Sequence, residues 1–333
     1  MAPALVLARG VSSWLVRRAA QAGATLAVVL VLLFVLMRIA PGDPLTRITD
    51  RPLSPTEIAV LRARYSLDQP LSRQFASYLG GALRGDFGTS IEYGRPVAAL
   101  IAERLPATLL LGGAVLLVNF TLGVWLGALQ ATRRDTLLDR SLTALSLTGH
   151  AMPSFWLGLV LAWLVGVRWR LLPAAGMENP LLDPSAGMPA RAADVMAHLA
   201  LPALTLCVVS LATTMRYQRR AMIEVLRFPY IATARAKGVP ERQVRRHHAW
   251  RNALFPVLTL FGLWLPILVT GTVFVESVFA WPGLGSLAAE AVGARDYPLL
   301  MGTAALSATL VVVGGILTDL AYAVLDPRVR VAA

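Results

Sequence analysis

Six stretches of the chain are predominantly apolar, and each approaches or exceeds the ~20 residues that a helix needs to cross a hydrocarbon core of roughly 30 Å. The fourth stretch is the shortest. The pattern predicts an all-α membrane protein with six transmembrane helices, placed approximately at Trp14 to Ile39, Ala107 to Ala131, Ser141 to Val167, Leu199 to Met215, Leu254 to Val275 and Leu299 to Leu325.

The first apolar stretch differs from a secretory signal, although Arg9, Arg17 and Arg18 precede it. Its apolar run is longer than a signal core, and it ends in the sequence IAPGDP rather than in a small-x-small cleavage site. We therefore expect a retained helix.

Composition agrees with a single membrane domain. Hydrophobic residues make up 56% of the chain and charged residues 15%, with a mean hydropathy of +0.62, which is too apolar for an ordinary soluble protein. The sequence shows no linker between two halves and no internal repeat. The single cysteine, Cys207, lies in an apolar run, so a disulfide framework is excluded.

The net charge of +12 is unevenly distributed over the loops. With six spans, the N-terminus, the loop around Arg133, the loop from Arg216 to Arg251 and the C-terminal tail share one side, where they carry 18 basic and 5 acidic residues. The opposite side carries 13 of each. Because cytoplasmic loops are enriched in Arg and Lys, both termini are predicted to be cytoplasmic. Nucleic-acid binding is not needed to explain the charge.

The first external segment, residues 41–105, is long enough to fold. The sequence SPTE from Ser54 predicts a capping box and a helix that runs to about Tyr65. Pro70 begins a second candidate helix, which Gly85 ends. Two interpretations stay open: a small cap packed on the spans, or a surface for an external partner.

Residues 222–252, between the fourth and fifth spans, are predicted to form a helical hairpin on the cytoplasmic face. Pro229 allows a helix to begin near Tyr230, Gly238 is placed to end it, and Pro240 begins a second helix that runs into span five. The arginines are typical of a lipid-headgroup anchor. The surface of small residues formed by Ile231, Ala232, Thr233, Ala234 and Ala236 would instead let another protein backbone approach closely.

This hairpin resembles the cytoplasmic coupling loop, or EAA loop, of ABC importer permeases of the dipeptide, oligopeptide and nickel type. In that family three anchor positions, three variable residues and a glycine follow one another. The leading Glu and the later Ile-x-Leu-Pro are absent here, as in the peptide branch, whose Arg-Asn-Ala-Leu-x-Pro matches residues 251–256. The matching residues, with the Tyr that begins the helix, are Tyr230, Ala232, Thr233, Ala234, Arg235, Ala236, Lys237 and Gly238.

Further resemblances to this family extend over nearly the whole chain. Each is short, and their combination rather than any one of them carries the resemblance. They are PGDP at 41–44, RGDFG at 84–88, RLPAT at 104–108, MPSFW at 152–156, WPGLG at 281–285, RDYP at 295–298 and DPRVR at 326–330.

The resemblance implies the six-helix fold of type I ABC importer permeases, with a small helical external insertion between spans one and two. It divides the chain into the N-terminus with the first span (1–40), the external insertion (41–105) and a five-helix core (106–333) that holds the coupling loop.

The resemblance also implies a bacterial inner-membrane complex. The partners would be a second homologous permease in a heterodimer, two cytoplasmic ATPases, an external substrate-binding protein and membrane lipid. The ATPases would use ATP and magnesium, and this chain would bind no cofactor. Ala234 and Gly238 are expected to be the positions of closest docking to an ATPase.

Polar residues within the spans are candidates for lining a translocation path. The alternative for most of them is an interhelical hydrogen bond, worth ~0.6 kcal/mol on average. Asp319 is expected to be structural. The candidates are Asn119, Thr121, His150, Ser154, Thr259, Thr270 and Asp319.

The chain lacks residues for ATP chemistry of its own. Its one lysine, Lys237, does not follow the Gly-x-x-x-x-Gly of a phosphate-binding loop. The sequence GLGSLA at 283–288 has dinucleotide-binding spacing but follows a span, so it predicts a turn. Adjacent His247 and His248 point in different directions on a helix, and no metal site is predicted. We expect a transport subunit rather than an enzyme.

Two other classes remain as alternatives. A secondary, ion-coupled transporter would show inverted repeats and charges near the bilayer midplane, and an intramembrane protease would show a paired catalytic motif inside a span. Neither is apparent in the sequence. The resembling family serves dipeptides, longer peptides, nickel chelates and glutathione-like compounds, so the substrate stays open.

Overall fold

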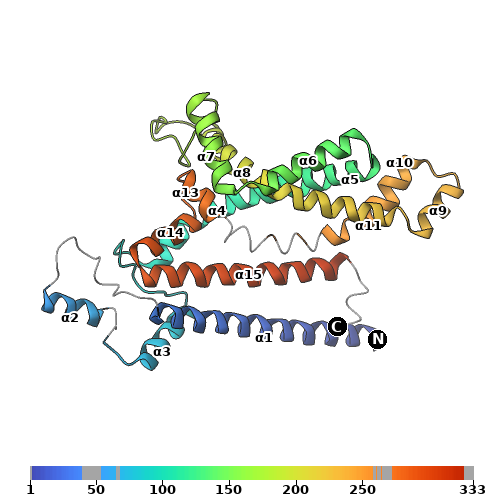
Figure 1. The fold of residues 1–333 in the computed structure, drawn as a ribbon. Coiled ribbons are helices and arrows are strands. Elements are labelled where there is room, and N and C mark those ends of the chain that lie inside the picture. The colour runs from blue at the N-terminus through green and yellow to red at the C-terminus, as the bar shows by residue number, and fades with distance from the viewer. Residues whose placement is uncertain are drawn as a thin grey trace.

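The computed structural model describes residues 2–39, 54–64, 68–257, 260, 264 and 272–325 (Figure 1). In these ranges the chain is helical without a named strand, which confirms the predicted all-α class there. The helices before the coupling loop are α1 (Ala2–Ile39), α2 (Pro55–Arg64), α3 (Leu71–Ala82), α4 (Val97–Val118), the π-helix η2 (Asn119–Gly123), α5 (Val124–Thr132), α6 (Leu137–Ala151), α7 (Ser154–Leu161), η3 (Ala162–Arg168) and α8 (Met188–Val225). They are followed by α9 (Pro229–Ala236), α10 (Glu241–Gln243), η4 (Val244–Ala249), α11 (Trp250–Ala253), α13 (Val273–Val278), α14 (Leu284–Ala294) and α15 (Tyr297–Leu325).

Four helical stretches are long and apolar enough to cross a membrane, and they overlap predicted spans one, two, four and six. The second is continuous through α4, η2 and α5. Predicted span five, at 254–275, lies largely outside the described residues, as do PGDP at 41–44 and DPRVR at 326–330. The four stretches are Arg17–Leu36, Val97–Thr132, Met188–Val225 and Tyr297–Thr318.

Predicted span three is not one straight helix. The stretch forms α6 and then α7 with η3, and the two halves are bent by 100°. Met152, between them, is extended at φ −78° and ψ 131°. A residue that precedes proline is pushed out of the helical region by the proline ring, so Pro153 is the physical reason for the bend.

Predicted span four is much longer than its apolar core. The prediction covered residues 199–215, whereas α8 has 38 residues. Beyond Met215, one face of the helix remains buried through Gln218, Met222 and Val225, while arginines occupy the other face. Burial of one face, rather than uniform apolarity, therefore sets the length of α8.

The long helix α8 is the centre of the described chain and contacts α4, α5, α6, α7, α11 and α13. Helices α1 and α15 run side by side in opposite directions (Figure 1). The first residues of α1 and the last residues of α15 lie toward the end of the molecule that carries α9. Helices α2, α3 and α14 lie at the opposite end (Figure 1).

The first external segment has the predicted helices. Ser54 and Glu57 form the expected reciprocal capping box: the Glu57 N–H donates to Ser54 Oγ at 3.2 Å and the Ser54 N–H donates to Glu57 Oε2 at 2.8 Å. Helix α3 packs on α1, with the rings of Phe75 and Tyr78 centred 5.2 and 6.0 Å from that of Phe34. Burial raises the pKa of Tyr78 to about 12. For α3, the packing supports a cap on the spans.

A buried carboxylate joins the helices at the α14 end. Glu276 of α13 is fully buried, and its Oε1 accepts hydrogen bonds from the hydroxyls of Thr108 and Thr272, both at 2.9 Å. Its Oε2 accepts one from the N–H of Ser286 at 2.9 Å. A Cβ at residue 283 would overlap this carboxyl group, which explains Gly283. The turn predicted for residues 283–288 is wrong beyond Gly283, because residues 284–288 form the first turns of α14.

A second buried carboxylate, that of Asp296, fixes the start of α15. It accepts hydrogen bonds from the Ser90 hydroxyl, from the Glu92 N–H at 3.0 Å and from the Leu299 N–H at 3.1 Å. Asp296 thus caps α15 and binds it to the loop that follows the external helices.

We predict that Glu276→Gln destabilises the protein by about 2 kcal/mol or more, because hydrogen bonds to charged groups contribute ~1.5–3 kcal/mol each and an amide nitrogen would face a donor. Thermal unfolding of the detergent-purified protein measures the loss. Glu178→Gln, at an exposed position, is the control. Equal unfolding midpoints for the two variants would contradict the structural role of Glu276.

Candidate functional site

The predicted coupling helix is α9, and its ends follow from local chemistry. Pro229 occupies its first turn and Phe228 before it is extended. At the other end, Gly238 has φ +77°; its N–H donates to Arg235 O at 2.9 Å, and the Val239 N–H donates to Ala234 O at 3.2 Å. This pair of bonds is a Schellman motif, in which a left-handed glycine ends the helix. The predicted start and end of the helix are confirmed.

One face of α9 is packed into the chain. Ile231 is fully buried and Ala234 is 8% exposed. Both lie in an apolar cluster with the end of α5, the end of α8 and the helices that follow. The other buried members of this cluster, called here the α9 cluster, are Ala131, Ala221, Met222, Val225, Val244, Ala249 and Ala253.

The other face of α9 is exposed. Ala234, expected at the docking contact, points into the α9 cluster, so a larger side chain there would disturb the chain's own packing first. The exposed residues are Tyr230, Ala232, Thr233, Arg235, Ala236, Lys237 and Gly238.

Polar contacts fasten α9 to the helices after it. Arg235 donates from Nε and Nη2 to the two carboxylate oxygens of Glu241, at 3.0 and 2.9 Å, and Arg245 donates to the same carboxylate at 3.1 Å. The Arg235 guanidinium, and then Arg245, lower the pKa of Glu241 to about 2. Asn252 Nδ2 donates to Tyr230 Oη at 3.0 Å. The hairpin is therefore one rigid unit with an exposed outer face.

The exposed outer face of this hairpin is strongly basic. Between residues 222 and 252 the acidic residues are Glu224 and Glu241 alone, against seven basic ones. Since Glu241 is already paired with two arginines, the surface offers net positive charge and small side chains to a partner.

The predicted path residues lie in different environments. Asn119 is fully buried between helices, and the Thr121 hydroxyl donates to Leu117 O. His150 is exposed with its Nδ1 3.1 Å from Val209 O, and Ser154 is half-buried at the start of α7. Thr259, Thr270 and the side chain of Asp319 lie outside the described residues. Their place on a translocation path stays a prediction.

Three buried polar side chains at the contact of α8 with η2 and α5 have no hydrogen-bond partner among the described residues. They are Asn119, Thr214 and Gln218. Asn119 can be identified from the sequence as a polar residue inside an apolar span. Nothing in the sequence shows that Thr214 and Gln218 face the same contact. Glu276 and Asp296 were likewise missed as buried groups, because their partners Thr108 and Ser90 lie 168 and 206 positions away in the sequence.

Comparison with known proteins places the chain among transport components. Residues 120–331 match the family model described as binding-protein-dependent transport system inner membrane component, and residues 11–112 match that of its N-terminal part. The oligopeptide transport system permease protein AppB of Bacillus subtilis is 39% identical over 320 residues, covering 96% of this chain and 99% of that protein.

Two further relatives have similar coverage. The dipeptide transport system permease protein DppB of Escherichia coli K12 is 38% identical, and a putative peptide permease protein of Brucella suis biovar 1 is 42% identical. In each case the match covers 90% of this chain and 93% of the relative. The matched regions include α9 and the whole helical hairpin.

We predict that the junction between α9 and α10 is insensitive to pH between 5 and 8. The pKa of Glu241 is lowered in the folded chain, so its pairing stabilises the junction above the unfolded value near 4.5 and is lost as pH falls toward 2. A nitroxide spin label at position 237 reports local mobility, which should rise only below about pH 4.5. Glu241→Gln should show no such rise, and a rise already at pH 6 would contradict the assignment.

Proposed function

The chain belongs to the family of binding-protein-dependent transport system inner membrane components, and we propose that it forms half of the pore of an ATP-driven importer with α9 as its contact to the ATPases. It is a multi-pass membrane permease subunit of an ABC importer. The observation that carries the ATPase contact is the exposed outer face of α9, held rigidly on the end of α8.

Peptides are the proposed substrates. The relatives reported above are named for peptides, oligopeptides and dipeptides, and they match the chain over nearly its whole length. The second half of the pore would be a homologous permease, and an external binding protein would deliver the substrate.

The two ATPase subunits would bind on the α9 side and hydrolyse ATP with magnesium. A basic outer face supports this placement, since cytoplasmic segments of membrane proteins are enriched in Arg and Lys. The beginning of α1 and the end of α15 lie toward the same side (Figure 1), so both termini would be cytoplasmic.

Close docking is assigned to the outward residues of α9. Ala232 and Ala236 are exposed and small, whereas Ala234 is turned inward. A partner groove would therefore enclose the Ala232 and Ala236 side, and Ala234 would hold α9 against the α9 cluster.

The proposed orientation predicts the labelling of single cysteines. In a Cys207→Ser background, Lys237→Cys should react with a membrane-impermeant maleimide only after the cells are opened. Leu181→Cys, which is 90% exposed in the loop before α8, should react on intact cells. The reverse pattern would place α9 outside the cell and overturn the proposed function.

The proposed contact predicts that Ala236→Trp lowers uptake about tenfold or more, because an overpacked contact costs ~1–3 kcal/mol and ~1.4 kcal/mol is a factor of ten. The variant should retain its thermal stability but recover less ATPase on co-purification.

Two matched variants separate docking from folding. Ala20→Trp, at an exposed position midway along α1 and away from α9, should leave uptake unchanged. Ala234→Trp should lower the unfolding midpoint, since it overpacks the α9 cluster. Normal ATPase recovery and uptake with Ala236→Trp would show that α9 is not the contact.

A further inference from the structure

An ion pair links the first turn of α6 to α8 near the α9 end. Arg219 of α8 donates from Nε to Asp139 Oδ1 at 2.9 Å and from Nη2 to Oδ2 at 2.7 Å. The side chain of Asp139 is 5% exposed and that of Arg219 is 29% exposed. Two parallel hydrogen bonds fix the mutual orientation of the two groups as well as their distance.

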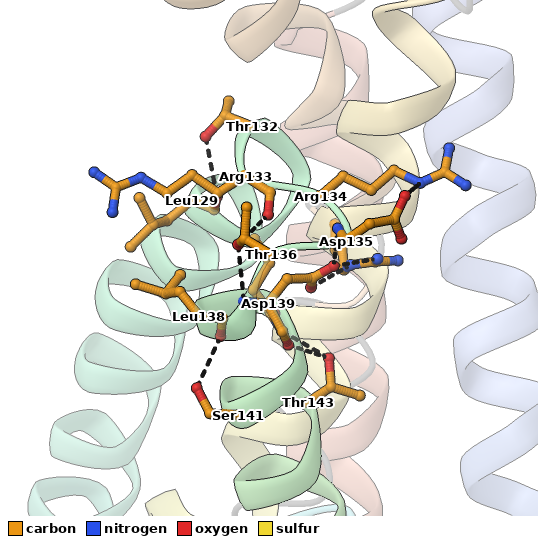
Figure 2. A network of polar contacts seen from close by, with 12 residues as sticks. Leu129, Thr132, Arg133, Arg134, Asp135, Thr136, Leu138, Asp139, Ser141 and Thr143 are labelled. Atoms are coloured by element: carbon orange, nitrogen blue, oxygen red, sulfur yellow. Dashed lines mark hydrogen bonds and ion pairs between the residues drawn. The ribbon is translucent and has the colours of Figure 1, made fainter.

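The Asp139 carboxylate is held from its own side by the turn between α5 and α6. Figure 2 shows Asp139 beneath this turn, where the Asp135 N–H donates to Oδ2 at 3.1 Å. Thr136 caps α6 by accepting from the Asp139 N–H at 3.4 Å. Asp139 is thus immobile relative to the turn.

Helix α5 is connected to Asp139 through hydrogen bonds of Gln130 and Thr143. Gln130 of α5 donates from Nε2 to the Thr143 hydroxyl at 3.0 Å, and the Thr143 hydroxyl donates to Asp139 O at 2.7 Å. Figure 2 shows Thr143 and Asp139 on successive turns of α6. The ion pair therefore connects α8 to both α5 and α6.

Arg219 lies close to the point where α9 is attached. It lies six positions before Val225, the last residue of α8, and Val225 packs with Ile231 and Ala234 in the α9 cluster. A displacement of α9 must move this end of α8, because the cluster is close-packed and transmits strain.

The contact between α5 and α8 beside the ion pair is close. Gly127 has no side chain, and a Cβ there would overlap the Met215 carbonyl oxygen and the Gln218 side chain. The missing side chain at residue 127 lets the two helices approach, but it supplies no group that fixes their register along the helix axis. Within the described ranges, the Asp139–Arg219 pair is the one ion pair between α6 and α8.

Stabilisation of the fold alone does not explain why an ion pair occupies this partly buried position. The desolvation of two charges offsets much of their attraction, and well-packed apolar residues often serve as well. What an apolar contact does not supply is a fixed angle and register between two helices.

Resting on the proposed function, we infer that Asp139 and Arg219 are positioning residues that transmit the movement of α9 to the α5–α6 hairpin. When the ATPases displace α9, the end of α8 moves with it. The ion pair makes the α5–α6 hairpin follow instead of sliding along α8.

The test uses the complete transporter in proteoliposomes with its binding protein, and it measures substrate uptake and ATP hydrolysis in the same sample. Asp139→Asn should lower uptake per ATP hydrolysed about fivefold or more, the lower end of typical coupling between sites. ATPase recovery should be unchanged. Arg219→Lys, which keeps the charge but loses the two-bond geometry, should give an intermediate ratio.

A matched control removes a neighbouring charge without touching the pair. Arg220→Gln should leave the uptake-to-ATP ratio at the wild-type value, since Arg220 is the next residue of α8 and is exposed. The reversed pair, Asp139→Arg with Arg219→Asp, should raise the ratio above that of either single variant.

A purely structural role gives a different result. If uptake and ATP hydrolysis fall together, so that their ratio stays at the wild-type value, the pair does not transmit movement and the inference is overturned. Failure of the α9 contact would appear separately, as normal ATPase recovery with Ala236→Trp.

Discussion

The close contact of α8 with the continuous helix of α4, η2 and α5 is the interaction on which the rest of the described structure depends. Lipid supplies no hydrophobic drive between apolar helices, so packing and small residues must hold them together. Gly127 meets the Met215 backbone and Gly123 meets the side chains of Leu211 and Thr214. Because α8 also contacts α6, α7, α11 and α13, its position fixes theirs.

The charged side chains at the two ends of this bundle differ in sign and in exposure. At the α14 end, Glu276 and Asp296 are fully buried and bonded by hydroxyls and backbone N–H groups of the same chain. At the α9 end, arginines outnumber carboxylates and most of them are exposed. The buried carboxylates have their hydrogen bonds satisfied within the chain, whereas the exposed arginines and small residues are available to contact another protein.

Apolar length and the turn residues were sufficient to predict much of the fold. Three features depend only on residues that are close together in the sequence, and all three were predicted. They are the capping box at Ser54, the start of α9 at Pro229 and its end at Gly238. The stretch around Pro153 was predicted as one span because hydropathy measures apolar length and carries no information on a change in backbone direction. The length of α8 was missed because its last turns are polar on one face and buried on the other.

The candidate site was predictable in place but not in orientation. Spacing located residues 230–238, but only the packing of the α9 cluster shows that Ala234 faces inward while Ala232 and Ala236 face outward. The pairing of Asp139 with Arg219 spans 80 positions, and no local pattern reports such a contact. The same holds for Glu276 and Thr108, which lie on separate helices.

In the proposed mechanism, these features allow α8 to act as a lever. Near its α14 end, Leu201 is fully buried against Val275 and Phe279, beside the rigid group around Glu276. From Leu201 to Val225 the helix extends ~36 Å, at ~1.5 Å per residue. A tilt of ~10° about this point would move the attachment of α9 by about 6 Å, and Arg219 by about 5 Å, at the same rise per residue. Because Val275 and Phe279 hold α8 at Leu201, a force applied at α9 would be taken up as rotation of α8 about this point.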